Sequence, residues 1–298
     1  MTMLSPVPRI RILLSAVVVA TLQSWVDSPA LAGWEAGAKG GYESNLSRSI
    51  DDGEGSGFLS AYAGYMKPHS GEARLDWTMG FTVEGAVYPS ITDVDSLSAT
   101  FSPGLAYIFS PVWSMAVTPF LQGKVVQDTE QSAVTFGARL DVIQKFDGGL
   151  YLGEYYTYTD SRANEDVYSY TEHAVGAYLG MRWKPGLYTE LGYEFSRGDS
   201  FLSVKVPETS VAGGTPVGVG APVGGGGRGS GGGGPQYSQA FDSLVFKERV
   251  DSHSVPVTVG IDWTKRWFST LNYTYRTWAG DSGKATDHSG YAGFGYRF

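Results

Sequence analysis

The feature that most constrains this chain is a two-residue alternation of apolar and polar side chains. It is clearest between residues 74 and 84, where Leu75, Trp77, Met79, Phe81 and Val83 alternate with Arg74, Asp76, Thr78, Gly80, Thr82 and Glu84. A helix would scatter both sets around its circumference, whereas a strand places them on opposite faces. This segment is therefore predicted to be a strand with one apolar and one polar face.

About twelve such segments follow one another, each close to the roughly ten residues of a tilted membrane-spanning strand. They lie at 34–42, 58–66, 74–84, 96–110, 115–125, 134–142, 150–158, 175–183, 187–195, 255–263, 267–277 and 291–298. After the N-terminal 32 residues, no continuous apolar run approaches the roughly 20 residues of a spanning helix. If the mature chain crosses a membrane, it does so with strands.

Short and long connections alternate strictly between these segments. The short ones are 67–71, 110–113, 145–149, 184–186 and 264–266, and most contain Pro or Gly, as tight turns require. The long ones are 48–57, 90–95, 128–132, 160–169, 197–251 and 280–288. This arrangement predicts an all-β fold, a transmembrane antiparallel up-and-down β-barrel of about 12 strands, with short periplasmic turns and long extracellular loops.

Aromatic residues near the predicted strand ends favour a membrane barrel over a soluble sandwich, which would concentrate them in mid-strand. They are expected to form two girdles at the membrane interfaces. The residues assigned to these girdles are Tyr88, Trp113, Tyr155, Tyr156, Tyr158, Tyr170, Trp183, Trp263, Trp267, Tyr275 and Trp278.

The first 32 residues have the order of a secretory signal peptide. Arg9 and Arg11 precede an apolar run at 12–22, and Ala30-Leu31-Ala32 follows as a small-x-small cleavage site. The apolar run is about half as long as a spanning helix. We therefore predict cleavage after Ala32 and a single barrel domain at 33–298, with a long Gly-rich extracellular loop at 197–251.

The amino-acid composition excludes several kinds of functional site. The chain has no cysteine, which excludes thiol catalysis and Cys-ligated metals, and its net charge of −8 argues against nucleic acid as a partner. Four scattered histidines form no clear metal site. The glycine runs at 213–234 are followed by neither Lys-Ser/Thr nor a helix pattern, so they indicate a linker rather than a phosphate loop. We expect no cofactor and no metal.

The long loop at 197–251 has flanks that differ from its centre. Apolar residues at 201–206 and 244–246 predict that the two adjoining strands extend as a hairpin beyond the membrane. The glycine tract is expected to be a mobile tip, because it buries too little apolar surface to offset the entropy of ordering. A neutral insertion is favoured over a loop that folds inward and restricts the lumen.

The polar strand faces are expected to line the lumen. Mixed charges would hold water there and bind polar solutes, but the same groups could pair across strands and fill the bore. A twelve-stranded barrel lies between plugged eight-stranded and open sixteen-stranded ones, so both outcomes stay open. The candidate lining residues are Arg74, Asp76, Glu84, Lys124, Arg139, Asp141, Arg182, Glu190, Glu194, Asp262 and Arg276, with Lys39, Glu35, Glu43 and Glu172 at equivalent positions.

The last eight residues resemble the C-terminal sorting signal of Gram-negative outer-membrane barrels. Phe294, Tyr296 and Phe298 share one face, and Phe is the final residue. The resemblance implies export through the periplasm, transient recognition by the barrel-assembly machinery, and insertion into outer-membrane lipid. It also implies that this strand pairs with 34–42 to close the barrel.

In its predicted number of strands, the chain resembles small twelve-stranded outer-membrane barrels. These include oligosaccharide-specific porins, nucleoside channels, translocator barrels and the outer-membrane phospholipase. No segment selects one of these families. The phospholipase family has a His-x-Ser pair on one strand, whereas no histidine here has Ser two positions later. We therefore expect no enzyme and predict a narrow, porin-like passive channel for small polar solutes. A closed structural or surface-display barrel is the alternative, a lipid-modifying enzyme is the third hypothesis, and the oligomeric state stays open.

Overall fold

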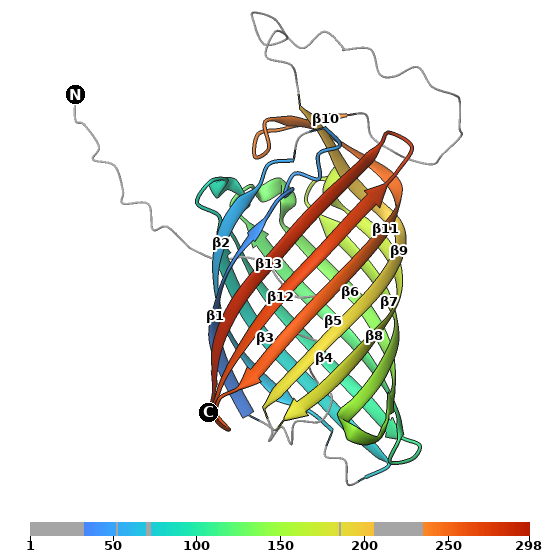
Figure 1. Ribbon diagram of the computed structural model, residues 1–298. Coiled ribbons are helices and arrows are strands. Elements are labelled where there is room, and N and C mark those ends of the chain that lie inside the picture. The colour runs from blue at the N-terminus through green and yellow to red at the C-terminus, as the bar shows by residue number, and fades with distance from the viewer. Residues whose placement is uncertain (1–32, 52, 70–72, 185, 206–234) are drawn as a thin grey trace, which may run out of the picture.

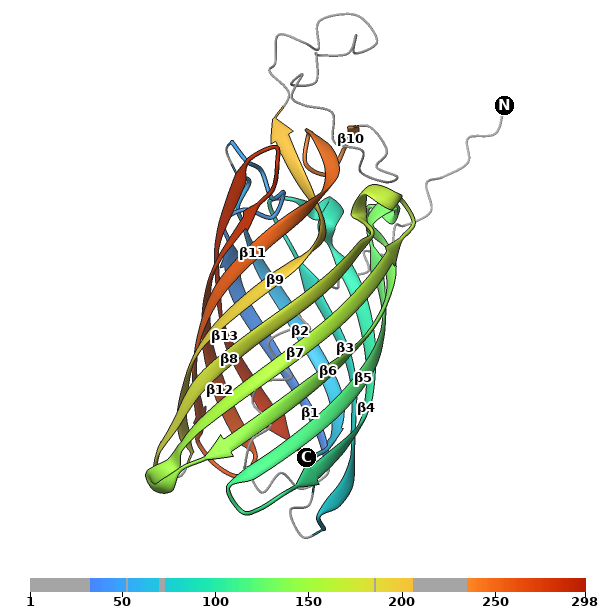
Figure 2. The same cartoon turned by 90° about the vertical axis from the view of Figure 1, so that its right-hand side faces the viewer.

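The alternating segments pair edge to edge into a closed antiparallel barrel of twelve strands in an up-and-down order (Figures 1 and 2). This computed structural model describes residues 33–298 except 52, 70–72, 185 and 206–234. The predicted signal peptide and the glycine tract therefore lie outside the described residues.

The barrel strands follow the predicted segments and are mostly longer. They are β1 (Gly33–Glu43), β2 (Ser56–Lys67), β3 (Leu75–Val87), β4 (Ser96–Ile108), β5 (Trp113–Val126), β6 (Ala133–Lys145), β7 (Leu150–Ala163), β8 (Tyr170–Lys184), β9 (Leu187–Lys205), β11 (Ser243–Asp262), β12 (Trp267–Ala279) and β13 (Lys284–Arg297). A short strand, β10 (Gln236–Ser238), pairs with β11 above the barrel. Among the described residues, the only helices are short 3-10 turns, and no helix is long and apolar enough to cross a membrane.

Closure occurs between the first and last strands, as predicted. β1 pairs antiparallel with β13, with Ala38 opposite Phe294, and the Phe298 amide donates to the Trp34 carbonyl at 2.9 Å. Both strands therefore meet at the end of the barrel that has the short turns, which we call the periplasmic end (Figure 1). A closed ladder leaves no strand edge in lipid.

One connection differs from the prediction. Residues 280–288 were expected to form a long loop, but β12 ends at Ala279 and β13 begins at Lys284. The Gly280 amide donates to the Gly283 carbonyl at 3.0 Å, which closes a tight turn. The prediction was wrong because residues at the start of β13, such as Asp287 and His288, are polar on both strand faces, so no alternation marks them.

The outward face of the barrel is apolar and exposed. Leu121 on β5 is 53% exposed, Leu271 on β12 is 58% exposed, and Leu179 on β8 is 50% exposed. A face of this kind in water would be a large unpartnered apolar surface. Together with a closed ladder, it is the lipid-facing band of a transmembrane barrel.

Some predicted girdle residues lie elsewhere. Trp183 and Trp263 are exposed on the outer wall, at 59% and 61%. By contrast, Tyr88, Tyr155 and Trp278 are buried, with 3%, 7% and 7% exposed. Tyr155 shares the inward parity of Tyr151 and Gly153 on β7, so nearness to a strand end alone does not place a ring in lipid.

Replacing Leu121 by Arg is expected to lower the free energy of unfolding by about 2–4 kcal/mol, because it moves a charge into mid-membrane lipid. The control is Gln122→Arg, one residue along β5, where the side chain faces inward and donates to Thr100 Oγ1 at 3.1 Å. Urea unfolding followed by tryptophan fluorescence measures both. Equal midpoints for the two variants would contradict the assignment of the faces.

Candidate functional site

The predicted lining residues lie on the inward face of the barrel strands, with one exception. Glu84, Arg139 and Glu190 are buried there. The half-buried residues at inward positions are Asp76, Lys124, Asp141, Arg182, Glu194, Asp262 and Arg276. Arg74 is exposed and precedes β3, so it is not a wall residue. The alternation runs on into the turn, and parity alone does not show where a strand begins.

A buried ion pair spans three strands of the inner wall. Lys39 Nζ on β1 lies 3.2 Å and 3.3 Å from the two carboxylate oxygens of Glu84 on β3. Ser60, on the intervening β2, donates to Glu84 Oε1 at 3.0 Å. The Lys39 ammonium also lies 4.9 Å from the ring centre of Tyr62 and 5.5 Å from that of Tyr291. These contacts hold both charged side chains against the wall.

A second charged group lies on β6. Arg139 Nε donates to both oxygens of Asp141, at 2.9 Å and 3.0 Å. The Arg139 guanidinium also stacks 3.8 Å from the ring centre of Tyr155 on β7. At the periplasmic end, Arg297 donates to Asp262 Oδ1 at 2.8 Å. The wall therefore has paired charges of both signs at several heights.

Two tyrosines of β7 reach across β8 to carboxylates on β9. Tyr151 donates to Glu190 Oε1 at 2.6 Å, and Tyr155 donates to Glu194 Oε2 at 2.7 Å. Their rings lie over glycines of β8, because a Cβ at Gly180 would overlap Tyr151 and one at Gly176 would overlap Tyr155.

The sequence-based prediction missed this tyrosine layer, which also includes buried Tyr178. The sequence signal for this layer was present in β7 and β8. Tyr151, Gly153 and Tyr155 of β7 share one parity, and Gly176, Tyr178 and Gly180 of β8 share the facing one. Glycine at inward positions leaves room for a ring from the neighbouring strand.

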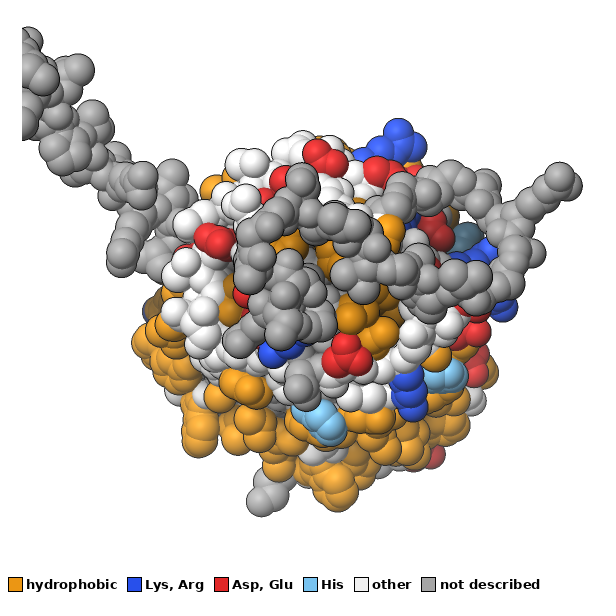
Figure 3. Space-filling model, turned by 90° about the horizontal axis from the view of Figure 1, so that it is seen from above, with side chains coloured by type: hydrophobic (Ala, Val, Ile, Leu, Met, Phe, Trp, Pro, Cys, Tyr) orange, Lys and Arg blue, Asp and Glu red, His pale blue; other side chains and the backbone are white. Residues whose placement is uncertain are grey.

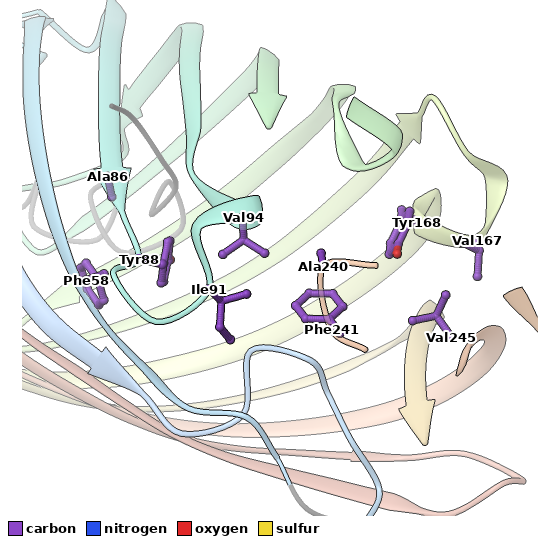
Figure 4. Packing of buried hydrophobic residues seen from close by; sticks show 10 residues of the cluster. All are labelled: Phe58, Ala86, Tyr88, Ile91, Val94, Val167, Tyr168, Ala240, Phe241 and Val245. Atoms are coloured by element: carbon purple, nitrogen blue, oxygen red, sulfur yellow. The ribbon is translucent and has the colours of Figure 1, made fainter. Parts of the chain in front are cut away.

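An apolar cluster, which we call the mouth cluster, lies in the external mouth of the barrel (Figure 4). Its members come from the external ends of β2, β3 and β11 and from loops far apart in the sequence. They are Phe58, Ala86, Tyr88, Ile91, Val94, Val167, Tyr168, Ala240, Phe241 and Val245, with Leu46, Ala163, Phe201 and Tyr291 packed against them. Figure 3 shows hydrophobic side chains both within the mouth and around the outer wall.

Phe241 lies in the middle of this cluster (Figure 4) and is 2% exposed. Its ring stacks on Phe201 of β9 with centres 6.0 Å apart, and Phe201 packs edge-on against Tyr168 at 5.3 Å. Phe241 belongs to the turn between β10 and β11, which is part of the longest connection. This described part of the loop therefore packs into the mouth, whereas the glycine tract, to which the prediction of a neutral insertion applies, lies outside the described residues.

The flanks of the same connection form the hairpin that their sequence predicts. β9 and β11 stay paired from Leu187 opposite Ile261 up to Lys205 opposite Ser243. Figure 2 shows β9 ending above the other strands. The strands therefore reach well past the predicted loop boundaries at 197 and 251.

Arg48, in the connection between β1 and β2, contacts β9 of this hairpin at the mouth of the barrel. Its guanidinium donates to Ser200 Oγ and lies 4.8 Å and 5.1 Å from the ring centres of Phe201 and Trp278. The Arg48 carbonyl accepts from the Ser203 amide at 3.2 Å. Burial lowers the pKa of Arg48 from its ordinary value, and the charge of Arg276 adds to this effect. A cation thus borders the apolar closure.

Across the described part of the chain, no group of three or more His, Asp or Glu side chains is placed to hold a metal ion. His173, His253 and His288 lie on the outer wall, each beside a tyrosine.

The similarity of this chain to known proteins is a similarity of fold. The structure resembles the COG4313 outer membrane channel from Pseudomonas putida F1, with a TM-score of 0.56 and 9% sequence identity over 90% of this chain and 97% of that chain. The NanC porin and the KdgM porin give TM-scores of 0.47 and 0.45 at 10% and 9% identity, covering 88% of this chain and 100% and 99% of theirs. No protein-family model and no curated protein matches the sequence.

Proposed function

We propose that this protein is a narrow passive channel for small polar solutes in the outer membrane of a Gram-negative bacterium. The observation that supports this best is the inner wall, where charges of both signs extend from Asp262 and Arg297 at one end to Arg276 near the other. Such a wall keeps water and polar solutes in a bore that crosses an apolar membrane.

The wall also supports a narrow bore. Glu84, Arg139 and Tyr178 point inward yet are only 2%, 6% and 4% exposed, because neighbouring inward side chains cover them. Other inward residues, including Lys124, Glu194 and Arg276, are half-buried and remain accessible. A bore that is partly filled in this way suits small solutes. The excess of 30 acidic over 22 basic residues in the chain favours cations weakly.

Recordings in planar bilayers test the proposal. Purified, heat-modifiable protein is expected to give small discrete current steps, with a reversal potential displaced toward cation selectivity in a salt gradient. Folded protein that inserts without any current steps would reject conduction and support the alternative, a closed barrel that displays its loops. The mouth cluster is the observation that favours this alternative. A null result in phospholipid hydrolysis by the same preparation would support the absence of an enzyme.

The proposed location has its own test at the N-terminus. Signal cleavage after Ala32 makes Gly33 the first residue, and Gly33 begins β1, so removal of the preceding residues leaves the ladder complete. Mass spectrometry of protein extracted from outer membranes is expected to show Gly33 as the N-terminus. Retention of residues 1–32 would contradict the predicted processing.

Deleting Phe298 is expected to lower the amount of assembled barrel in the outer membrane. Phe298 is 75% exposed and forms an outer aromatic ladder with Tyr296, Trp267 and Phe294, with Trp267 stacked 5.0 Å from Phe294. Phe294, Tyr296 and Phe298 are the residues assigned to recognition by the barrel-assembly machinery. Quantitative blotting of membrane fractions measures the loss. Phe298→Tyr, which keeps a terminal aromatic ring, is the matched control, and unchanged levels after the deletion would refute the assignment.

A further inference from the structure

Three of the four histidines make the same contact on the lipid-facing side of the barrel. Tyr156 hydrogen-bonds His173 Nδ1 at 2.7 Å, and the equivalent distances for Tyr193 with His253 and for Tyr273 with His288 are both 2.8 Å. Each pair joins the two strands of one external hairpin: β7 and β8, β9 and β11, or β12 and β13. The repetition indicates a built feature rather than three chance contacts.

A second aromatic ring holds each imidazole. The rings of Tyr158, Phe195 and Tyr275 lie 5.1, 5.3 and 5.0 Å from their histidines, with interplanar angles of 51°, 52° and 48°. In every case this ring is two residues after the hydrogen-bonded tyrosine, on the same strand face. Each imidazole is therefore fixed between a hydroxyl and a ring in the same orientation.

The three pairs form one band around this half of the barrel. His173 on β8 pairs with Arg197 on β9, and Arg197 pairs with Asp251 on β11, which is two residues before His253. In the same way, His253 pairs with Thr277 on β12, and Thr277 pairs with Thr286 on β13, which is two residues before His288. Because barrel strands are tilted, residues at one height shift in register from strand to strand. Figure 3 shows histidines at the outer rim next to the hydrophobic wall.

The hydrogen bond at Nδ1 can leave a proton on Nε2 of each imidazole. When the tyrosine hydroxyl donates to Nδ1, the neutral ring has its proton on Nε2, and the protonated ring has one there as well. In these two states Nε2–H is a donor on a face that contacts lipid. Such a donor needs an acceptor, since an unpaired polar group in hydrocarbon is costly.

The charges just beyond the band point to the acceptor. Arg162, Arg197 and Lys284 lie on the same outward faces, nearer the external loops, and the first two are 75% and 58% exposed. Asp160 and Asp251 lie beside them, 3.2 Å from Arg162 and 3.4 Å from Arg197, respectively. Exposed guanidinium groups above a row of N–H donors match phosphate oxygens.

We propose that the outer wall from β7 to β13 binds phosphate-bearing headgroups of outer-leaflet glycolipid through Nε2 of His173, His253 and His288. The proposal rests on insertion in the outer membrane and is independent of conduction. It assigns the band to lipid recognition, with the tyrosines as positioning residues and the opposite half of the barrel as ordinary lipid contact.

Native mass spectrometry of the detergent-solubilised barrel tests this, with bisphosphorylated lipid A and its dephosphorylated form as probes. The wild type is expected to bind the phosphorylated form more tightly. Loss of charge-assisted hydrogen bonds in the triple variant His173→Phe, His253→Phe, His288→Phe should weaken that binding about tenfold. The triple His→Gln variant, which keeps a side-chain N–H donor, should recover most of it. His69→Phe, a histidine in the β2–β3 connection outside the band, is the matched control and should bind as the wild type does.

Two results would overturn the proposal. One is equal affinity of the wild type for the two lipid forms, which requires no variant to fold. The other is unchanged binding in a triple Phe variant that still shows heat-modifiable migration. Bilayer conductance of this variant should equal that of the wild type, so loss of lipid binding is distinguishable from failure of the channel proposal.

Discussion

Replacing Lys39 by Met is expected to destabilise the barrel by about 3–5 kcal/mol, because it leaves a buried carboxylate without its cation. The Glu84 side chain is 2% exposed, and its oxygens lie 3.2 Å and 3.3 Å from Lys39 Nζ. After the substitution, the Ser60 hydroxyl, at 3.0 Å, is the one side-chain donor to Glu84 that remains within the described part of the chain. The free energy of urea unfolding, measured with Glu84 in place, reports this cost.

The double variant Lys39→Met, Glu84→Gln separates the charge from the packing. Neutralising both partners removes the unpaired charge, so much of the lost stability should return. The control is Arg162→Met, which removes one partner of the exposed Arg162–Asp160 pair, 3.2 Å apart, and should cost below about 1 kcal/mol. Equal losses for Lys39→Met and Arg162→Met would show that the inner wall is as hydrated as the exposed external end of β7, where Arg162 lies.

The strand pattern of this barrel could be predicted because a membrane barrel puts lipid on one face of every strand and a polar interior on the other. Because of that contrast, apolar and polar residues alternate with a period of two in segments such as β3 and β5. The alternation did not mark the strand ends correctly where the two strand faces do not differ in polarity. It continued past the start of β3 to Arg74, and it vanished at the start of β13, where both faces are polar.

The side chains that meet inside the barrel were less predictable. Parity places Lys39, Glu84 and Tyr151 on the inner wall, but pairing depends on register, which varies with the length of each turn. Lys39 reaches Glu84 across β2, and Tyr151 reaches Glu190 across β8. These contacts skip a strand, and no local pattern in the sequence specifies them.

The mouth cluster was the least predictable feature. Ile91, Val167 and Phe241 belong to three different connections and meet only because the barrel brings its external loops to one rim. Each lies with only one or two other apolar residues in an otherwise polar loop, a pattern that alone indicates nothing. Their convergence shows that the described part of the longest connection packs into the mouth while its strands extend outward.

Replacing Phe241 by Ala is expected to raise the single-channel conductance clearly. The ring is 2% exposed at the centre of the mouth cluster and stacks on Phe201. An apolar constriction blocks ions because water leaves it, so it controls conductance more strongly than a polar wall of the same width. Removing the ring shortens the contact between the β10–β11 turn and the opposite loops, and the gap admits water.

The matched control is Tyr237→Ala, an aromatic residue of the same connection that is 49% exposed. It lies on β10 and is not a member of the mouth cluster, so its loss should leave the conductance unchanged. Heat-modifiable migration shows that both variants are assembled. If Phe241→Ala conducts as the wild type does, the cluster is packing above an already open path. If neither it nor the wild type conducts, the inner wall itself is closed, and the Lys39–Glu84 and Tyr151–Glu190 layers become the groups that fill the bore.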